Sequence, residues 1–233
     1  DEVILPSFTI ISCVLEMVRA GLRPVFADCD PSTWNVDASE VERRITAKTR
    51  ALMVVHIYGL PSDMDPLLAL ARKYNLFVIE DAAEQIGQTY RGRPCGSFGE
   101  LSTLSFYPNK HVTTGEGGMI LTDDPKLAER CRSLRNLCFE PPRRFMHREL
   151  GSNFRMSNLQ AAVGVAQLER LDSFLEKKRW IGARYREILG DVAEIELPPD
   201  ETPYARNVYW VFGLVLRDQV PFDALEAMKR LAT

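Results

Sequence analysis

The sequence predicts an α/β protein with a mostly parallel sheet flanked by helices. Short apolar runs alternate along the chain with amphipathic segments whose apolar residues recur at helical spacing. Several of the short runs are apolar throughout, as expected for strands that are covered on both faces. Alternating strands and helices are joined by right-handed crossovers, and such connections produce a parallel sheet.

The first half of the chain carries the clearest alternation. Strands are predicted at residues 3–5, 24–27, 51–57 and 76–79, and helices at residues 11–20, 38–45 and 66–74. Polar residues that end parallel strands gather at the carboxyl edge of the sheet, where α/β proteins bind ligands. Asp81 ends the fourth run and is therefore expected at this edge.

The pattern changes after Gly99. Two strands are expected at residues 103–106 and 119–121, and Pro125 then opens a helix that runs to about Leu134. Residues 139–149 are rich in Pro, Arg and Phe, and we interpret them as an irregular loop.

The last third of the chain begins with a long helical pattern. Ser157 and Gln160 fit a capping box, and the pattern continues to about Leu189 with a break expected near Asp172. A linker at residues 198–199, an apolar strand at residues 208–216 and a helix from Pro221 are predicted to follow. The helical stretch is long enough to bridge two domains.

Composition excludes several classes of protein. The formal net charge of -3 gives no electrostatic footprint for nucleic acid or an anionic membrane. We interpret the basic clusters at residues 143–144 and 177–179 as solvated surface. No apolar run approaches the length of a membrane span. The chain opens inside a predicted strand without an initiator Met, which indicates either trimmed termini or an unusually short protein.

The cysteines and histidines favour neither disulfides nor a metal site. The five cysteines are odd in number and contain no C-x-x-C pair, which indicates reduced thiols in a cytoplasmic protein. The three histidines lie far apart, without metal-ligand spacing, so we expect no metal.

Lys110 and Asp81 are the leading candidates for chemistry. Lys110 lies on a loop between two predicted strands, after Phe106, Tyr107 and Pro108 and before three glycines. A lysine that forms a Schiff base and a carboxylate that holds a pyridinium nitrogen are the two groups that pyridoxal phosphate chemistry most needs. Taken alone, Lys110 would be read as a surface lysine and Asp81 as the cap of a following helix.

Other polar residues are weaker candidates. The Ser105 hydroxyl and the Asn153 amide, which lies just before a helix, could each reach a phosphate. We interpret His111 as a polar loop residue, and His56, which lies in an apolar strand, as a satisfied core histidine.

Five ordered segments make the chain resemble the pyridoxal-phosphate-dependent nucleotide-sugar aminotransferases of the DegT/DnrJ class. These segments are residues 24–28 (PVFAD), 55–59 (VHIYG), 79–84 (IEDAAE), 105–118 (SFYPNKHVTTGEGG) and 153–162 (NFRMSNLQAA). Within the class, residues 5–12, 59–66 and 80–84 are most similar to GDP-perosamine synthases. Those enzymes convert GDP-4-keto-6-deoxymannose to an amino sugar of lipopolysaccharide O-antigens, with glutamate as amino donor.

The resemblance implies a fold, a cofactor and a set of site residues. It implies aminotransferase fold type I, with a large cofactor-binding domain at residues 1–170 and a linking helix and the start of a small α+β domain at residues 171–233. Lys110 would form the internal aldimine with pyridoxal 5'-phosphate and shuttle protons. Asp81 would hold the pyridine nitrogen, Glu84 would face the ring near its phenolic oxygen, and Ser105 would contact the phosphate.

The resemblance also implies a homodimer. Asn153 matches a phosphate contact that is given in trans, so each active site would lie at the interface of two copies. The cofactor and the substrates, a nucleotide sugar and an amino acid, would be the other partners, with no nucleic acid or membrane.

The chain also departs from the family pattern. Ile10 stands where many members carry an aromatic residue that stacks on the cofactor ring. Family members are considerably longer, and the N-terminal helix start that cradles the phosphate and most of the C-terminal domain have no counterpart here.

Three alternative functions are considered. Related sugar 3-dehydratases use the same cofactor and fold but replace the lysine by histidine, and His111 lies beside Lys110. Alignment on Pro108 and the Gly115 turn places the lysine at the catalytic position. A non-catalytic truncated relative is the second alternative. A Rossmann oxidoreductase is disfavoured because no G-x-G-x-x-G joins an early strand to a helix.

Overall fold

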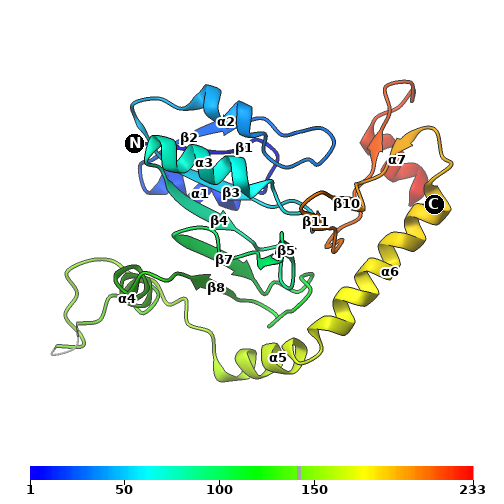
Figure 1. Ribbon diagram of the computed structural model, residues 1–233. Coiled ribbons are helices and arrows are strands. Elements are labelled where there is room, and N and C mark those ends of the chain that lie inside the picture. The colour runs from blue at the N-terminus through cyan, green and yellow to red at the C-terminus, as the bar shows by residue number, and fades with distance from the viewer. Residues whose placement is uncertain (141–142, 233) are drawn as a thin grey trace.

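The computed structural model describes residues 1–140 and 143–232, and its centre is a six-stranded sheet (Figure 1). The strand order is β2-β1-β3-β4-β7-β8. All pairs are parallel except β7 with β8, which is antiparallel. The strands are β1 (Glu2–Pro6), β2 (Arg23–Ala27), β3 (Thr49–Val55), β4 (Phe77–Asp81), β7 (Leu101–Ser105) and β8 (Gly118–Leu121). The predicted α/β fold with a mostly parallel sheet is confirmed.

Helices connect and flank these strands. They are α1 (Ser12–Arg19), α2 (Ala38–Arg44), α3 (Met64–Tyr74), α4 (Pro125–Leu134), α5 (Asn158–Leu168), α6 (Leu171–Leu189) and α7 (Ala224–Leu231). Two-residue strands form three small ribbons: β5 (Thr89–Tyr90) with β6 (Arg93–Pro94), β10 (Glu201–Thr202) with β11 (Ala205–Arg206), and β12 (Val215–Leu216) with β9 (Ile195–Glu196). Figure 1 shows α6 as a long arm between α5 and the C-terminal segment.

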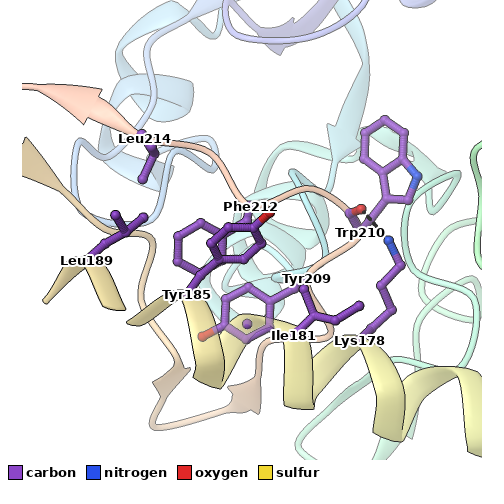
Figure 2. A pocket seen from close by; sticks show the side chains of 9 residues that line it. Lys178, Ile181, Tyr185, Leu189, Tyr209, Trp210, Phe212 and Leu214 are labelled. Atoms are coloured by element: carbon purple, nitrogen blue, oxygen red, sulfur yellow. Dashed lines mark hydrogen bonds between the residues drawn. The ribbon is translucent and has the colours of Figure 1, made fainter. Parts of the chain in front are cut away.

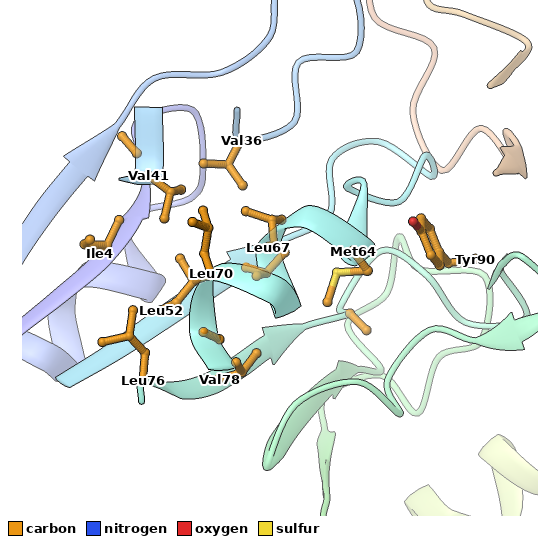
Figure 3. Packing of buried hydrophobic residues seen from close by; sticks show 14 of the residues in the cluster. Ile4, Val36, Val41, Leu52, Met64, Leu67, Leu70, Leu76, Val78 and Tyr90 are labelled. Atoms are coloured by element: carbon orange, nitrogen blue, oxygen red, sulfur yellow. The ribbon is translucent and has the colours of Figure 1, made fainter. Parts of the chain in front are cut away.

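Each face of the sheet has its own apolar core. Successive side chains of a strand point to opposite faces, so Ile4 packs with Val41, Leu67 and Leu70 of α2 and α3 (Figure 3). The neighbouring residues of β1 pack with Cys13 and Met17 of α1 on the other face. Burial on both faces explains why these strands are apolar throughout rather than alternating.

Local capping sets several helix boundaries. The Asp37 carboxylate accepts from the backbone N–H groups of Ser39 and Glu40 at the start of α2, and the Asp124 carboxylate plays the same part before Pro125 in α4. The capping box of α5 is present, because Ser157 and Gln160 bond reciprocally. The expected break in the long helical stretch falls between Leu168 and Leu171.

The predicted strand at residues 208–216 is wrong for most of its length. Only Val215–Leu216 is a strand, and Tyr209 has a φ of 49°. The backbone N–H of Val208 bonds to the Gly59 carbonyl, while the Tyr209 N–H bonds to the Asn207 side chain. These apolar residues therefore pack against other segments instead of entering a ladder.

Two smaller predictions also shift. The last helix begins at Ala224 rather than Pro221, because the Asp223 side chain caps it by accepting from the Glu226 N–H. Residues 139–149 are irregular where the structure describes them, and residues 141 and 142 lie outside the described part.

The described residues include no helix with the length and hydropathy that a membrane span requires. All five cysteines are free thiols.

Candidate active site

Four of the predicted site residues lie at the carboxyl edge of the sheet. Asp81 is the last residue of β4, and β7, its parallel neighbour, ends at Ser105. Lys110 follows in the loop that leads to β8. Glu84 lies in the turn after β4, and its Oε1 is 3.8 Å from Lys110 Nζ.

Asp81 is held at this edge by three donors. Its Oδ1 accepts from the Ala83 N–H at 3.0 Å and from the Thr103 hydroxyl at 3.2 Å. Its Oδ2 accepts from the Cys13 thiol of α1 at 3.3 Å. A turn, and not a helix, follows Asp81, so the interpretation of Asp81 as a helix cap is wrong.

Glu84 and Lys110 are both removed from solvent. Their side chains are only 16% and 10% exposed. Burial raises the pKa of Glu84 to about 7, against the opposing effects of the Tyr58 backbone N–H, which it accepts at 2.6 Å, and of the Lys110 charge. Burial also lowers the pKa of Lys110, while Glu84 and Asp81 act in the opposite direction. Burial therefore disfavours the charged form of both groups.

Ser105 lies at the same edge, and its hydroxyl oxygen accepts from the Tyr107 N–H at 3.3 Å. Asn153 lies elsewhere in the fold. Its side chain is exposed, its backbone pairs with Asn136, and its Oδ1 accepts from Arg155 Nε at 2.8 Å. Within the described chain, no contact joins Asn153 to the Lys110 cluster.

The charges that act on His111 are those of Lys178, Lys110 and Arg179. This histidine lies in the loop as expected but is buried rather than solvated, with only 6% of its surface exposed. Burial lowers its pKa to about 4, with further lowering by Lys178 of α6. Lys110, not its histidine neighbour, therefore faces Glu84 and Asp81.

His56 is the satisfied core histidine that the sequence indicates. Its Nδ1 accepts from the Ser62 N–H at 3.1 Å, so Nε2 carries the proton and donates to Glu80 at 3.0 Å. Burial alone would raise the pKa of Glu80, but the hydrogen bonds from His56 and from the loop after Cys95 outweigh it and lower the pKa to about 2. Cys95 lies close to this pair, yet both histidine nitrogens are already engaged.

Sequence reasoning missed two neighbours of the site. The indole of Trp210 lies over Lys110, with Nζ 3.6 Å from the ring centroid. Cys13 contacts Asp81 from α1. Both contacts join segments far apart in the chain, and no local pattern signals them.

A cavity of about 400 Å³ lies beside the site, between α6 and the segment that carries Trp210 (Figure 2). Figure 2 shows Lys178, Ile181, Tyr185 and Leu189 of α6 on one side, and Tyr209, Trp210, Phe212 and Leu214 on the other. Its lining is mostly apolar and does not include the Asp81 and Glu84 carboxylates.

The donor set fits pyridoxal phosphate. A buried lysine amine, a strand-end carboxylate and a hydroxyl at the end of the next strand lie along one sheet edge. Ala82 and Ala83, the two residues after the carboxylate, are small. Ile10, which the resemblance matches to an aromatic stacking position, is 65% exposed just before α1.

Comparison with known proteins shows the same family over nearly the whole chain. The model of the DegT/DnrJ/EryC1/StrS aminotransferase family matches residues 1–232. GDP-perosamine synthase of Caulobacter vibrioides is 45% identical over 96% of this chain and 62% of its own length. GDP-perosamine synthase of Escherichia coli O157:H7 is 41% identical over 93% of this chain and 59% of its own length.

Solved structures agree with the fold. The structure of DesI in the presence of its TDP-sugar product superposes with a TM-score of 0.89 at 33% identity, over 99% of this chain and 58% of that one. A GDP-4-keto-6-deoxymannose-3-dehydratase variant superposes with a TM-score of 0.90 at 23% identity, over all of this chain and 64% of that one, which supports the fold alone. The chain thus spans about three fifths of the length of the relatives it matches.

Proposed function

Because the chain belongs to the DegT/DnrJ/EryC1/StrS aminotransferase family, we propose that it carries the catalytic core of a sugar-nucleotide aminotransferase. Enzymes of this family use pyridoxal 5'-phosphate. The similarity to two GDP-perosamine synthases supports GDP-perosamine as the product. GDP-4-keto-6-deoxymannose as the acceptor and glutamate as the amino donor follow from the resemblance of the sequence to this class of enzyme. The observation that carries the proposal is the largely solvent-shielded Lys110–Glu84 pair beside Asp81.

Four residues of this chain would hold the cofactor. Lys110 Nζ would bond to its aldehyde carbon, the Asp81 carboxylate would accept a hydrogen bond from the protonated pyridine nitrogen and keep it protonated, and Ser105 would donate to the phosphate. Glu84 would lie near the phenolic oxygen. When bound, pyridoxal phosphate supplies an aldehyde and an electron-accepting ring, through which an amino group passes from donor to acceptor.

The chain's own groups do the proton chemistry. The Lys110 amine must lose a proton to act as nucleophile and base, and its burial favours that loss. Burial raises the pKa of Glu84 to about 7, and its Oε1 lies 3.8 Å from Nζ, so a small approach of the two side chains on ligand binding would let it take up that proton and return it. The Asp81 carboxylate keeps its position through the Ala83 and Thr103 hydrogen bonds.

Asn153 would act from a second copy of the chain. Its exposed side chain and its separation from Lys110 within one copy are consistent with a phosphate contact in trans. The active form would then be a homodimer with two interfacial sites.

Reduction with borohydride tests the cofactor lysine. We expect the protein incubated with pyridoxal phosphate to carry a pyridoxyl adduct on Lys110, detected by peptide mass spectrometry, and the variant Lys110→Arg to carry none. An adduct on another lysine, or on none, would contradict the proposal.

Product analysis separates the transferase from the dehydratase. With glutamate and GDP-4-keto-6-deoxymannose, we expect an amino sugar nucleotide. A 3-deoxy keto sugar would favour the dehydratase, which the placement of Lys110 and not His111 toward the carboxylates argues against.

A further inference from the structure

The indole of Trp210 covers the Lys110 amine. Nζ lies 3.6 Å from the ring centroid, within the range of a cation–π contact. On another side Nζ faces the Glu84 carboxylate at 3.8 Å. The lysine side chain is 10% exposed, so these two groups replace most of its hydration.

Trp210 is fixed by three contacts, one to its indole and two to its backbone. Its Nε1–H donates to the carbonyl of Asn109, the residue before the lysine, at 2.9 Å. The Trp210 carbonyl accepts from Lys178 of α6 at 3.0 Å, as the dashed line in Figure 2 marks. Its backbone passes so close to Gly59 that a Cβ there would lie 2.7 Å from the Trp210 nitrogen.

These contacts join the C-terminal segment to the lysine loop. We infer that Trp210 is a positioning residue, which holds the Lys110 amine at the sheet edge between its indole face and the Glu84 carboxylate. This inference rests on the proposed function, in which Lys110 is the cofactor lysine.

The indole supplements the weak attraction between the Glu84 carboxylate and the Lys110 ammonium. Because the pKa of Glu84 is raised to about 7, the carboxylate is only partly ionised at neutral pH and attracts the ammonium less than an ordinary glutamate would. The π face of Trp210 does not titrate, so it stabilises the ammonium over the whole pH range. The Lys110 side chain is thereby held in one place until a ligand enters.

The titration of Lys110 in the cofactor-free protein tests this inference. The labelling rate of Lys110 with acetic anhydride, followed by peptide mass spectrometry as a function of pH, reports its pKa. Trp210→Leu keeps an apolar cover but removes the π face, so we expect the Lys110 pKa to fall by roughly half a unit to one unit. Trp210→Phe keeps an aromatic face, and we expect a pKa close to that of the unchanged protein.

The sign of the change separates positioning from a general packing role. If Trp210 merely sealed the site, Trp210→Leu would admit water and raise the Lys110 pKa, and that result would overturn the inference, as would an unchanged pKa. Trp180→Leu is the matched control, because Trp180 also has a lysine over its ring, Lys177, but is 57% exposed on α6. It should leave the Lys110 titration unchanged.

The two proposals fail in different experiments. The pyridoxyl adduct on Lys110 tests the function, whereas the titration uses no cofactor. An adduct in the unchanged protein, together with an unaltered titration in Trp210→Leu, would remove the role of Trp210 and leave the proposed function standing.

Discussion

At the scale of single residues, the charge state of Lys110 depends on Glu84. Burial lowers the lysine pKa, and the carboxylate 3.8 Å away partly restores it. Above pH 7 the carboxylate is mostly ionised, so its charge is present when the lysine titrates. Glu84→Gln removes that charge at nearly constant volume, and we expect the Lys110 pKa to fall by about one unit or more.

An NMR titration of the lysine side-chain nitrogens can check this expectation, with Lys110→Arg to assign the signal. Glu40→Gln is a suitable control, because Glu40 pairs with arginines on α2. An equal Lys110 pKa in the unchanged protein and in Glu84→Gln would show that the pair is not coupled.

The sequence predicts those site residues that follow a recognisable strand. Asp81 and Lys110 each follow an apolar run, and parallel neighbours bring such ends to one edge. Trp210 is not predictable in this way. Its contact with Asn109 spans 101 positions, and it lies in a segment whose apolar pattern indicates a strand that does not form.

At the scale of elements, the start of α5 is tied to the lysine loop. Ser157 and Gln160 form the capping box, and Gln160 Nε2 also donates to the carbonyl of Glu116 in the glycine-rich turn, at 3.1 Å. Loss of the Ser157 hydroxyl leaves a backbone N–H of the first helical turn unpaired. We expect Ser157→Ala to lower the free energy of unfolding by about 1 kcal/mol.

Urea denaturation measures this change. Ser173→Ala is the control, since Ser173 is exposed and bonds only to the Arg170 carbonyl, and it should alter stability by no more than about 0.5 kcal/mol. Equal stabilities of the two variants would mean that the capping box contributes nothing beyond an ordinary surface serine.

At the scale of the whole molecule, the sequence predicts the sheet better than the segments beyond it. The central strands β1 and β3 contribute residues to the apolar clusters on both faces of the sheet, and such burial gives continuous apolar runs that can be recognised in the sequence. Residues 207–214 are equally apolar, yet they pack on α6 and the Gly59 loop. Which partner buries an apolar run is decided by tertiary packing, and periodicity alone does not encode it.

The buried His111 makes the stability of the whole molecule depend on pH. Burial lowers its pKa to about 4, below the ordinary value of 6.5, and its Nε2 has no hydrogen-bond partner among the described residues. Below pH 6.5 the unfolded chain binds a proton that the folded chain takes up only near pH 4. The contribution of His111 to stability is therefore fully present above pH 6.5 and is lost as the pH falls toward 4.

This lost stability can be isolated with His111→Gln, which removes the titrating group and keeps a polar side chain. Between about pH 7.5 and pH 5, we expect the unchanged protein to lose about 2 kcal/mol more of its free energy of unfolding than the variant does. Glu84, whose raised pKa favours the folded state as pH falls, is present in both proteins and cancels in the difference. Urea denaturation at the two pH values measures the loss, and equal losses would mean that His111 is protonated in the folded chain as readily as in the unfolded one.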